Sequence, residues 1–113
     1  MTLDTSSFGR ALASARKHLK MSQKDLAGKI RKEDGETITP QYLNDIEHDR
    51  RSPSSDHMVK EFARVLGGGT EITEELLYLL AGRVPADVKR RNITAAQASA
   101  AFTAFRKELL RKS

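Results

Sequence analysis

The sequence predicts an all-α protein in which five short helices are followed by a C-terminal helix. Apolar residues recur at steps of three and four through almost the whole chain, as they do on the buried face of a helix. Serine, threonine and proline stand where these patterns begin, and no stretch alternates apolar and polar residues as strands do. A chain of 113 residues has the size of about one domain, which excludes a second catalytic domain.

The first two helices are predicted over residues 6–19 and 23–31. Ser22 precedes the second helix as an N-cap, with Asp25 in the first turn. The charged segment 32–36 contains a glycine and no apolar residue, so it is predicted to be an exposed turn. The residues expected to face the core from these two helices are Phe8, Leu12, Ala15, Leu19, Leu26, Ala27 and Ile30.

The third and fourth helices are predicted from their start signals. Thr39 is followed by Pro40, and proline suits the first helical position because its φ is fixed and its missing N–H would be unpaired there. Residues 52–56 end the third helix and cap the fourth, which stops at the glycines 67–69. The residues expected to be buried are Leu43, Ile46, Met58, Val59, Phe62, Ala63 and Leu66.

The fifth helix is predicted to begin after Thr73 and to end at Gly82. It is apolar almost all round, which is typical of a helix with two partners. A linker is expected at about residues 83–92, because Pro85 disfavours helix at the residue before it. The sixth helix follows from Thr94, with a narrow apolar stripe of Ala98, Phe102, Phe105 and Leu109.

Composition and charge limit the functions that are open to the chain. It contains no cysteine, which excludes disulfides, thiolate metal sites and cysteine nucleophiles. No stretch approaches the roughly 20 apolar residues of a membrane helix, and the N-terminus lacks the apolar core of a signal peptide, so we expect a cytoplasmic protein without a membrane partner.

The net charge of +5 is unevenly distributed along the chain. Residues 1–82 hold 12 basic and 13 acidic residues, whereas residues 83–113 hold 8 basic and 2 acidic ones. We therefore expect two regions, a domain over 1–82 and a basic linker with an amphipathic helix over 83–113. The excess of positive charge favours a polyanionic partner.

The residue pattern resembles the phage-repressor (XRE/Cro) helix-turn-helix family over roughly residues 8–66. The elements that match are an arginine in the first helix, a glutamine that opens the second, Leu-Ala in its middle, an Ile-Glu pair in the third and an Arg-x-Pro-Ser tail. They are supplied in order by Arg16, Gln23, Leu26-Ala27, Ile46-Glu47 and Arg51-Ser52-Pro53-Ser54.

One segment departs from the family pattern. Arg31 stands where typical members have glycine, and about six extra residues precede Ile38. A longer turn costs only about 0.6 kcal/mol per doubling of its length, so we expect the fold to tolerate it. The pose of the third helix on DNA is the property that this turn can change.

The resemblance implies a repressor-like DNA-binding domain whose third helix lies in the major groove of double-stranded DNA. Glutamine and asparagine can bond bidentately to adenine, so Gln41 and Asn44 are the leading candidates for base contact. The complete set implied for base contact is Thr39, Gln41, Asn44 and Asp45, and the set implied for phosphate contact is Gln23, Lys24, Tyr42, Arg50 and Arg51.

Structural alternatives exist for several of these residues. Tyr42 can simply pack against the body, and Arg50 and Arg51 can form a solvated basic turn. Arg16 and Glu47 resemble the family's ion pair between the first and third helices, which orients the third helix and does not read sequence.

Self-association is implied for the C-terminal part, since family members commonly form dimers through the region after the fourth helix. The candidates are Leu76, Leu79 and Leu80 in the fifth helix and Phe102, Phe105 and Leu109 in the sixth. The leucines can instead close the core of one chain, and the sixth helix can dock on its own domain. The basic residues Lys89, Arg90 and Arg91 either contact phosphates or only solubilise the linker.

No enzyme, cofactor or metal site is indicated. The three histidines His18, His48 and His57 lie far apart in the sequence and have no helical metal spacing. Ser54, Ser55, Asp56 and His57 stand where a helix cap belongs, and adjacent residues cannot form the geometry of a catalytic triad.

These observations predict a dimeric transcriptional regulator, a repressor in preference to an activator, that reads a pseudopalindromic operator. The alternatives are an antitoxin that binds its own promoter and a toxin, and a helix-turn-helix fold that serves only protein interaction. No sensor domain is recognisable, so regulation by concentration, by a protein partner or by a small molecule near the last two helices all stay open.

Overall fold

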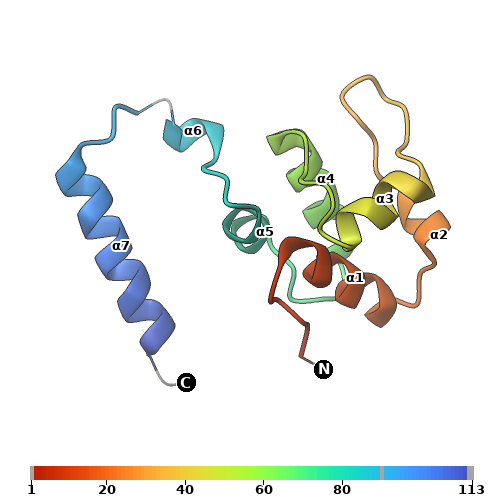
Figure 1. Ribbon diagram of the computed structural model, residues 1–113, viewed down its shortest axis with the longest axis horizontal. Helices are drawn as coiled ribbons and strands as arrows, with labels where there is room; N and C mark the ends of the chain where they lie inside the picture. Colours follow the sequence, from red (N-terminus) through yellow and green to blue (C-terminus); the bar gives the residue numbers. More distant parts are fainter. Residues whose placement is uncertain (1, 90, 112–113) are drawn as a thin grey trace.

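The computed structural model describes residues 2–89 and 91–111, and within these ranges it is entirely helical, as the sequence predicts. Five helices form a body, and a short sixth and a long seventh follow it (Figure 1). The helices are α1 Phe8–His18, α2 Gln23–Ala27, α3 Pro40–Glu47, α4 Asp56–Leu66, α5 Glu74–Ala81, α6 Ala86–Lys89 and α7 Ala95–Leu110.

Hydroxyl side chains cap six of the seven helices at their N-termini. In each case the side-chain oxygen accepts a hydrogen bond from the backbone N–H three residues later, which satisfies a donor that the helix itself leaves unpaired. Each such cap contributes about 1 kcal/mol to stability. The caps are Ser7, Ser22, Thr39, Ser55, Thr73 and Thr94.

The core lies between α1, α3, α4 and α5, with α2 packed on α3. Phe8 and Phe62 meet edge to face at its centre, with ring centroids 6.2 Å apart. The apolar periodicity predicts most of the core correctly, and Leu77 and Tyr78 are the buried residues of α5. The side chains with no more than 1% exposure include Leu12, Leu26, Ile30, Leu43, Ile46, Val59 and Leu66.

The second helix is shorter than predicted, because it ends at Ala27 and not near residue 31. Ile30 is nevertheless completely buried, although it lies beyond the end of the helix. A small hairpin follows, closed by a bridge between Arg31 and Thr37, with Gly35 at a φ of +87° in its tip. The glycine is needed there because other residues rarely adopt this conformation.

This hairpin, residues 31–37, is tied to α4 and is not a loose turn. Ser55 Oγ donates to Glu33 Oε1 at 2.6 Å, and the backbone N–H of Arg31 donates to Glu61 Oε1 at 3.1 Å. His57 Nε2 lies 2.8 Å from the backbone oxygen of Arg31. The extra residues are therefore held against α4, the helix that follows α3.

The linker predicted over residues 83–92 contains the short helix α6, so it is not wholly irregular. Arg83 Nε donates to Asp56 Oδ1 at 3.1 Å, and the backbone N–H of Ala86 donates to Asp56 Oδ2 at 3.0 Å. Partial desolvation opposes ionisation of Asp56, but these two hydrogen bonds outweigh it and hold the pKa below its usual range. Arg90 lies outside the described residues.

The seventh helix stands apart from the body (Figure 1). The radius of gyration is 15.2 Å, above the roughly 13 Å of a compact chain of this length. Within the described residues, every large hydrophobic side chain that is exposed lies at Leu79 or beyond it. The body therefore covers its own apolar surface, whereas the C-terminal part does not.

No helix in the described ranges is long and apolar enough to cross a membrane.

Candidate nucleic-acid interface

Helix α3 presents one buried face and one polar face. Its start is set by Thr39, whose Oγ1 accepts from the N–H of Tyr42 at 3.1 Å, and by Pro40 at the first position, as predicted. Leu43, Ile46 and Glu47 are buried. Thr39 and Gln41 are exposed and Asn44 and Asp45 are half-buried, so all four predicted base-contact residues lie on the solvent side.

A buried ion pair anchors α3 to α1. Arg16 Nε donates to Glu47 Oε2 at 2.7 Å, and Arg16 Nη2 donates to Glu47 Oε1 at 3.0 Å. The two side chains are only 11% and 3% exposed. Arg16 Nη1 also donates to the backbone oxygen of Met21, which ties the same guanidinium to the start of α2. This is the pair that the resemblance implies, and its bidentate geometry orients α3 on the body.

The same network continues to the polar face of α3 through Gln23. Its Nε2 amide donates to Glu47 Oε1 at 3.0 Å and to Asn44 Oδ1 at 3.1 Å. Both protons of the amide are thus used inside the protein. Gln23 therefore positions Asn44. A contact of Gln23 with phosphate would have to use groups other than this side-chain NH₂.

A second pair of contacts organises the other side of the polar face. Gln41 Nε2 donates to Asp45 Oδ1 at 3.1 Å, and Arg50 Nη1 lies 3.6 Å from the same carboxylate oxygen. Arg50 thereby partly compensates the negative charge of Asp45 on this face of α3. Gln41 is held along the helix, with its amide oxygen left as an acceptor.

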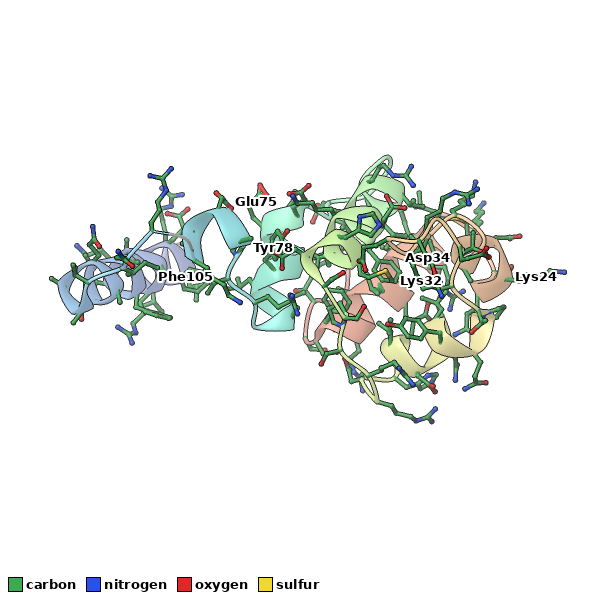
Figure 2. The ribbon with its side chains drawn as sticks, turned by 90° about the horizontal axis from the view of Figure 1, so that it is seen from above. Lys24, Lys32, Asp34, Glu75, Tyr78 and Phe105 are labelled. Carbon is green, nitrogen blue, oxygen red and sulfur yellow. The ribbon has the colours of Figure 1, made fainter. Side chains whose placement is uncertain are left out.

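Exposed cations precede and follow α3 in the chain. The side chain of Lys24 extends from the end of the molecule opposite to α7 (Figure 2). After α3, the Arg51 guanidinium carbon lies 4.9 Å from the centre of the Tyr42 ring. Tyr42 is partly buried against the core, so it packs against the body, as one of the two predicted roles requires. Its ring also makes a cation–π contact with Arg51.

The contact of α3 with the start of α1 is a feature that sequence reasoning missed. Asp49, which has a φ of +58°, accepts from Ser7 Oγ at 2.6 Å and from the Gly9 N–H at 2.9 Å. A Cβ at Gly9 would lie 2.4 Å from the backbone oxygen of Ile46 and 2.6 Å from that of Glu47. A glycine inside a helical pattern is the one sequence signal for such a close approach.

Replacing Gly9 with alanine is therefore expected to lower the free energy of unfolding by about 1–3 kcal/mol, because the clashing oxygens belong to the backbone of α3. Gly68→Ala is the matched control, since a Cβ there meets nothing within 4 Å. Urea titration of both variants measures the effect. Equal stability of the two would show that α1 and α3 can separate slightly without cost.

The residues predicted for dimerisation have different environments. Leu76 and Leu80 are partly buried against the core of their own chain, whereas Leu79 is 51% exposed. In α7, Phe102 is 62% exposed, Leu109 is 67% exposed and Phe105 is 36% exposed. In this structure α7 does not pack on the body, and these side chains face solvent.

One further polar feature was not predicted. The hydroxyl of Tyr78 is buried and makes no hydrogen bond within residues 2–89 and 91–111. Burial raises the pKa of Tyr78, and the nearby carboxylates Asp56, Glu74 and Asp87 raise it further. Figure 2 shows Tyr78 with Glu75 on α5, on the side of the body that leads to α6 and away from Lys24.

No group of three or more potential metal ligands gathers in the described part of the chain.

Comparison with known proteins gives one match. A family model described as Helix-turn-helix matches residues 12–72, which is more than half of the chain and contains α2, α3 and the hairpin between them. No curated protein and no solved structure matches the chain.

Proposed function

The chain belongs to the XRE-type helix-turn-helix family of DNA-binding regulators, and from this premise we propose that it is a dimeric repressor that reads a pseudopalindromic operator with α3. The proposal rests on how α3 is fixed to the body and on the side chains that its outer face presents. Its inner face is fixed by a buried ion pair, and its outer face offers the amides of Gln41 and Asn44. A polar face held this rigidly suits recognition of base edges in the major groove.

Gln41 and Asn44 are the proposed base readers. Each lies on the solvent side of α3 and has its amide held by one hydrogen bond, to Asp45 and from Gln23 respectively. A carbonyl oxygen accepts two hydrogen bonds, so Asn44 Oδ1 can still accept from an adenine amino group while its amino group donates to N7. Thr39 at the start of the helix and Asp45 complete the proposed set.

Phosphate contacts are proposed on both sides of α3. Lys24 stands at the start of α2. Arg50 and Arg51 follow α3, and Arg51 stacks on the ring of Tyr42. The backbone at Gln23 adds an amide donor near the start of α2. Because residues 1–82 carry almost no net charge, affinity is expected to depend on these few cations and on the basic segment 83–113.

Dimerisation is assigned to the segment 83–113 together with Leu79. Its support is the distribution of exposed apolar side chains, which begins at Leu79 and continues to Leu110. A two-fold dimer would place two copies of α3 about 34 Å apart, one turn of the DNA helix. The division into a DNA-binding domain over 1–82 and an association segment over 83–113 follows from this assignment.

An antitoxin is the second candidate, since the exposed apolar side chains of α7 also suit a protein partner such as a toxin. In that case the α7 side chains stay accessible in the free protein. A monodisperse dimer in which Phe102 and Phe105 are protected from solvent would therefore exclude this candidate.

The proposed function is tested with Lys24→Ala. This variant is expected to weaken binding to operator and to random duplex DNA alike, and to lower the salt dependence by about one unit of slope, because one phosphate contact is lost. Fluorescence anisotropy across a salt series measures both quantities. Lys60→Ala, on the exposed side of α4, removes the same charge and is expected to change little.

The decisive negative result is an unaltered chain that shows no salt-dependent affinity for any duplex. That result would leave the fold as a protein-interaction module only.

A further inference from the structure

The apolar residues of α7 form a regular series with a gradient of size. Ala95, Ala98, Phe102, Phe105 and Leu109, here called the α7 stripe, follow one another at steps of three, four, three and four. This is the heptad spacing of helices that pack along their length. The small residues occupy the first half, the large ones occupy the second half, and Phe102 stands at the midpoint of Ala95–Leu110.

The first half of α7 also borders an apolar groove. Val84, Val88 and Ile93 line one side, and Ala98, Ala101 and Phe102 line the other, around a volume of about 410 Å³. Val84, Val88 and Ile93 are each between 39% and 49% exposed. The place where the stripe has its smallest side chains is therefore the place where the chain leaves room for larger ones.

We propose that α7 pairs with α7 of a second copy of this chain in antiparallel orientation, with the two-fold axis near Phe102. In this register Ala95 faces the partner's Leu109 and Ala98 faces the partner's Phe105, so large side chains enter the groove beside small ones. A parallel pair would set alanine against alanine and leave the groove open. The inference rests on the proposed dimeric function and names the surface and orientation that form the dimer.

The charges of α7 favour the same orientation. Arg106, Lys107 and Arg111 lie at or just after its C-terminal end. A parallel pair would bring the two clusters together. In an antiparallel pair with its axis at Phe102, the two copies of Arg106 lie roughly 12 Å apart along the helices and the two copies of Arg111 roughly 27 Å apart, beyond a Debye length of about 8 Å. The antiparallel arrangement also opposes the two helix dipoles favourably.

The exposed surface is large enough for a specific contact. With typical side-chain areas, the exposed fractions of the groove and stripe residues leave roughly 600 Å² of apolar surface per copy. Burial in both copies reaches about 1,200 Å², the lower end for a specific interface. A single helix of this length is marginally stable in water even with a capping box and many alanines, so packing on a partner helix would add to the stability of α7.

Site-specific disulfide formation tests the orientation, because the natural chain has no cysteine. Ala95→Cys and Leu109→Cys chains carrying tags of different size are co-expressed and then oxidised. The expected main product is the mixed disulfide, while each variant alone gives no more cross-linking than the control. The control is Ala100→Cys, an exposed position on the opposite face of α7. Homodisulfides in either variant alone would overturn the antiparallel pairing.

A second variant keeps the test independent of cysteine chemistry. Phe102→Asp places two carboxylates at the proposed axis and is expected to shift the sedimentation coefficient to that of a monomer, with the circular dichroism of the body retained. An unchanged sedimentation coefficient would overturn the pairing. If the chain binds DNA as a dimer but gives no mixed disulfide, the antiparallel pairing is wrong and the proposed function stands. If the mixed disulfide forms but the chain does not bind DNA, the proposed function is wrong and the pairing stands.

Discussion

Replacing Arg16 with alanine is expected to lower the free energy of unfolding by about 3–5 kcal/mol, because it leaves the carboxylate of Glu47 buried without its cation. Glu47 is 3% exposed, and Gln23 alone would remain to donate to it. A domain of this size is stable by only about 5–15 kcal/mol, so the loss would be a large fraction of the total. Urea titration followed by circular dichroism measures the change.

The same helix supplies a matched control. Arg10 pairs with Asp4 at 3.6 Å, but its side chain is 66% exposed and that of Asp4 is 48% exposed. Arg10→Ala is therefore expected to cost no more than about 1 kcal/mol. If Arg16→Ala and Arg10→Ala lost equal stability, the buried pair would not be what holds α3 on α1.

The second large effect concerns recognition. Gln41→Ala is expected to weaken binding to the specific operator by about 1–3 kcal/mol and to leave binding to random DNA almost unchanged, because a bidentate base contact is lost and no phosphate contact is. Competition titrations with operator and random duplexes measure the two affinities separately.

Comparison with Lys24→Ala distinguishes base recognition from phosphate contact. Lys24 is exposed at the start of α2, so its removal should act on every sequence alike. Gln41→Ala also frees Asp45, but Arg50 still lies beside that carboxylate, so the fold of α3 is not expected to change. Equal losses on operator and random DNA would remove Gln41 from base readout.

Much of the fold follows from local rules. Cap residues such as Thr39 and Ser22 act through their own backbone neighbours, and the apolar periodicity reports which face a helix buries, so both are legible in the sequence. The prediction of a helix-turn-helix family is confirmed by the family model over residues 12–72. The ion pair of Arg16 and Glu47 was accessible only through the resemblance, since nothing local joins residues 31 positions apart.

The features that escaped prediction depend on contacts between distant segments. The apolar periodicity predicts residue 30 as helical, but the hairpin after it is set by hydrogen bonds to Ser55, the N-cap of α4, and to Glu61 within α4. The clamp of Asp49 on Gly9 joins residues 40 apart, and α6 owes its position to Asp56. Such tertiary contacts leave no periodic signal in the sequence.

Selection of bound sites from a random DNA pool, carried out at two salt concentrations and read by sequencing, tests most directly whether this chain is a sequence-specific dimeric DNA-binding protein. The predicted result is a pseudopalindrome whose half-sites are centred about 10 base pairs apart, because two copies of α3 related by a two-fold axis read successive turns of one groove. Enrichment of no sequence, at low salt as well as high, would contradict this function and point to a protein as the partner.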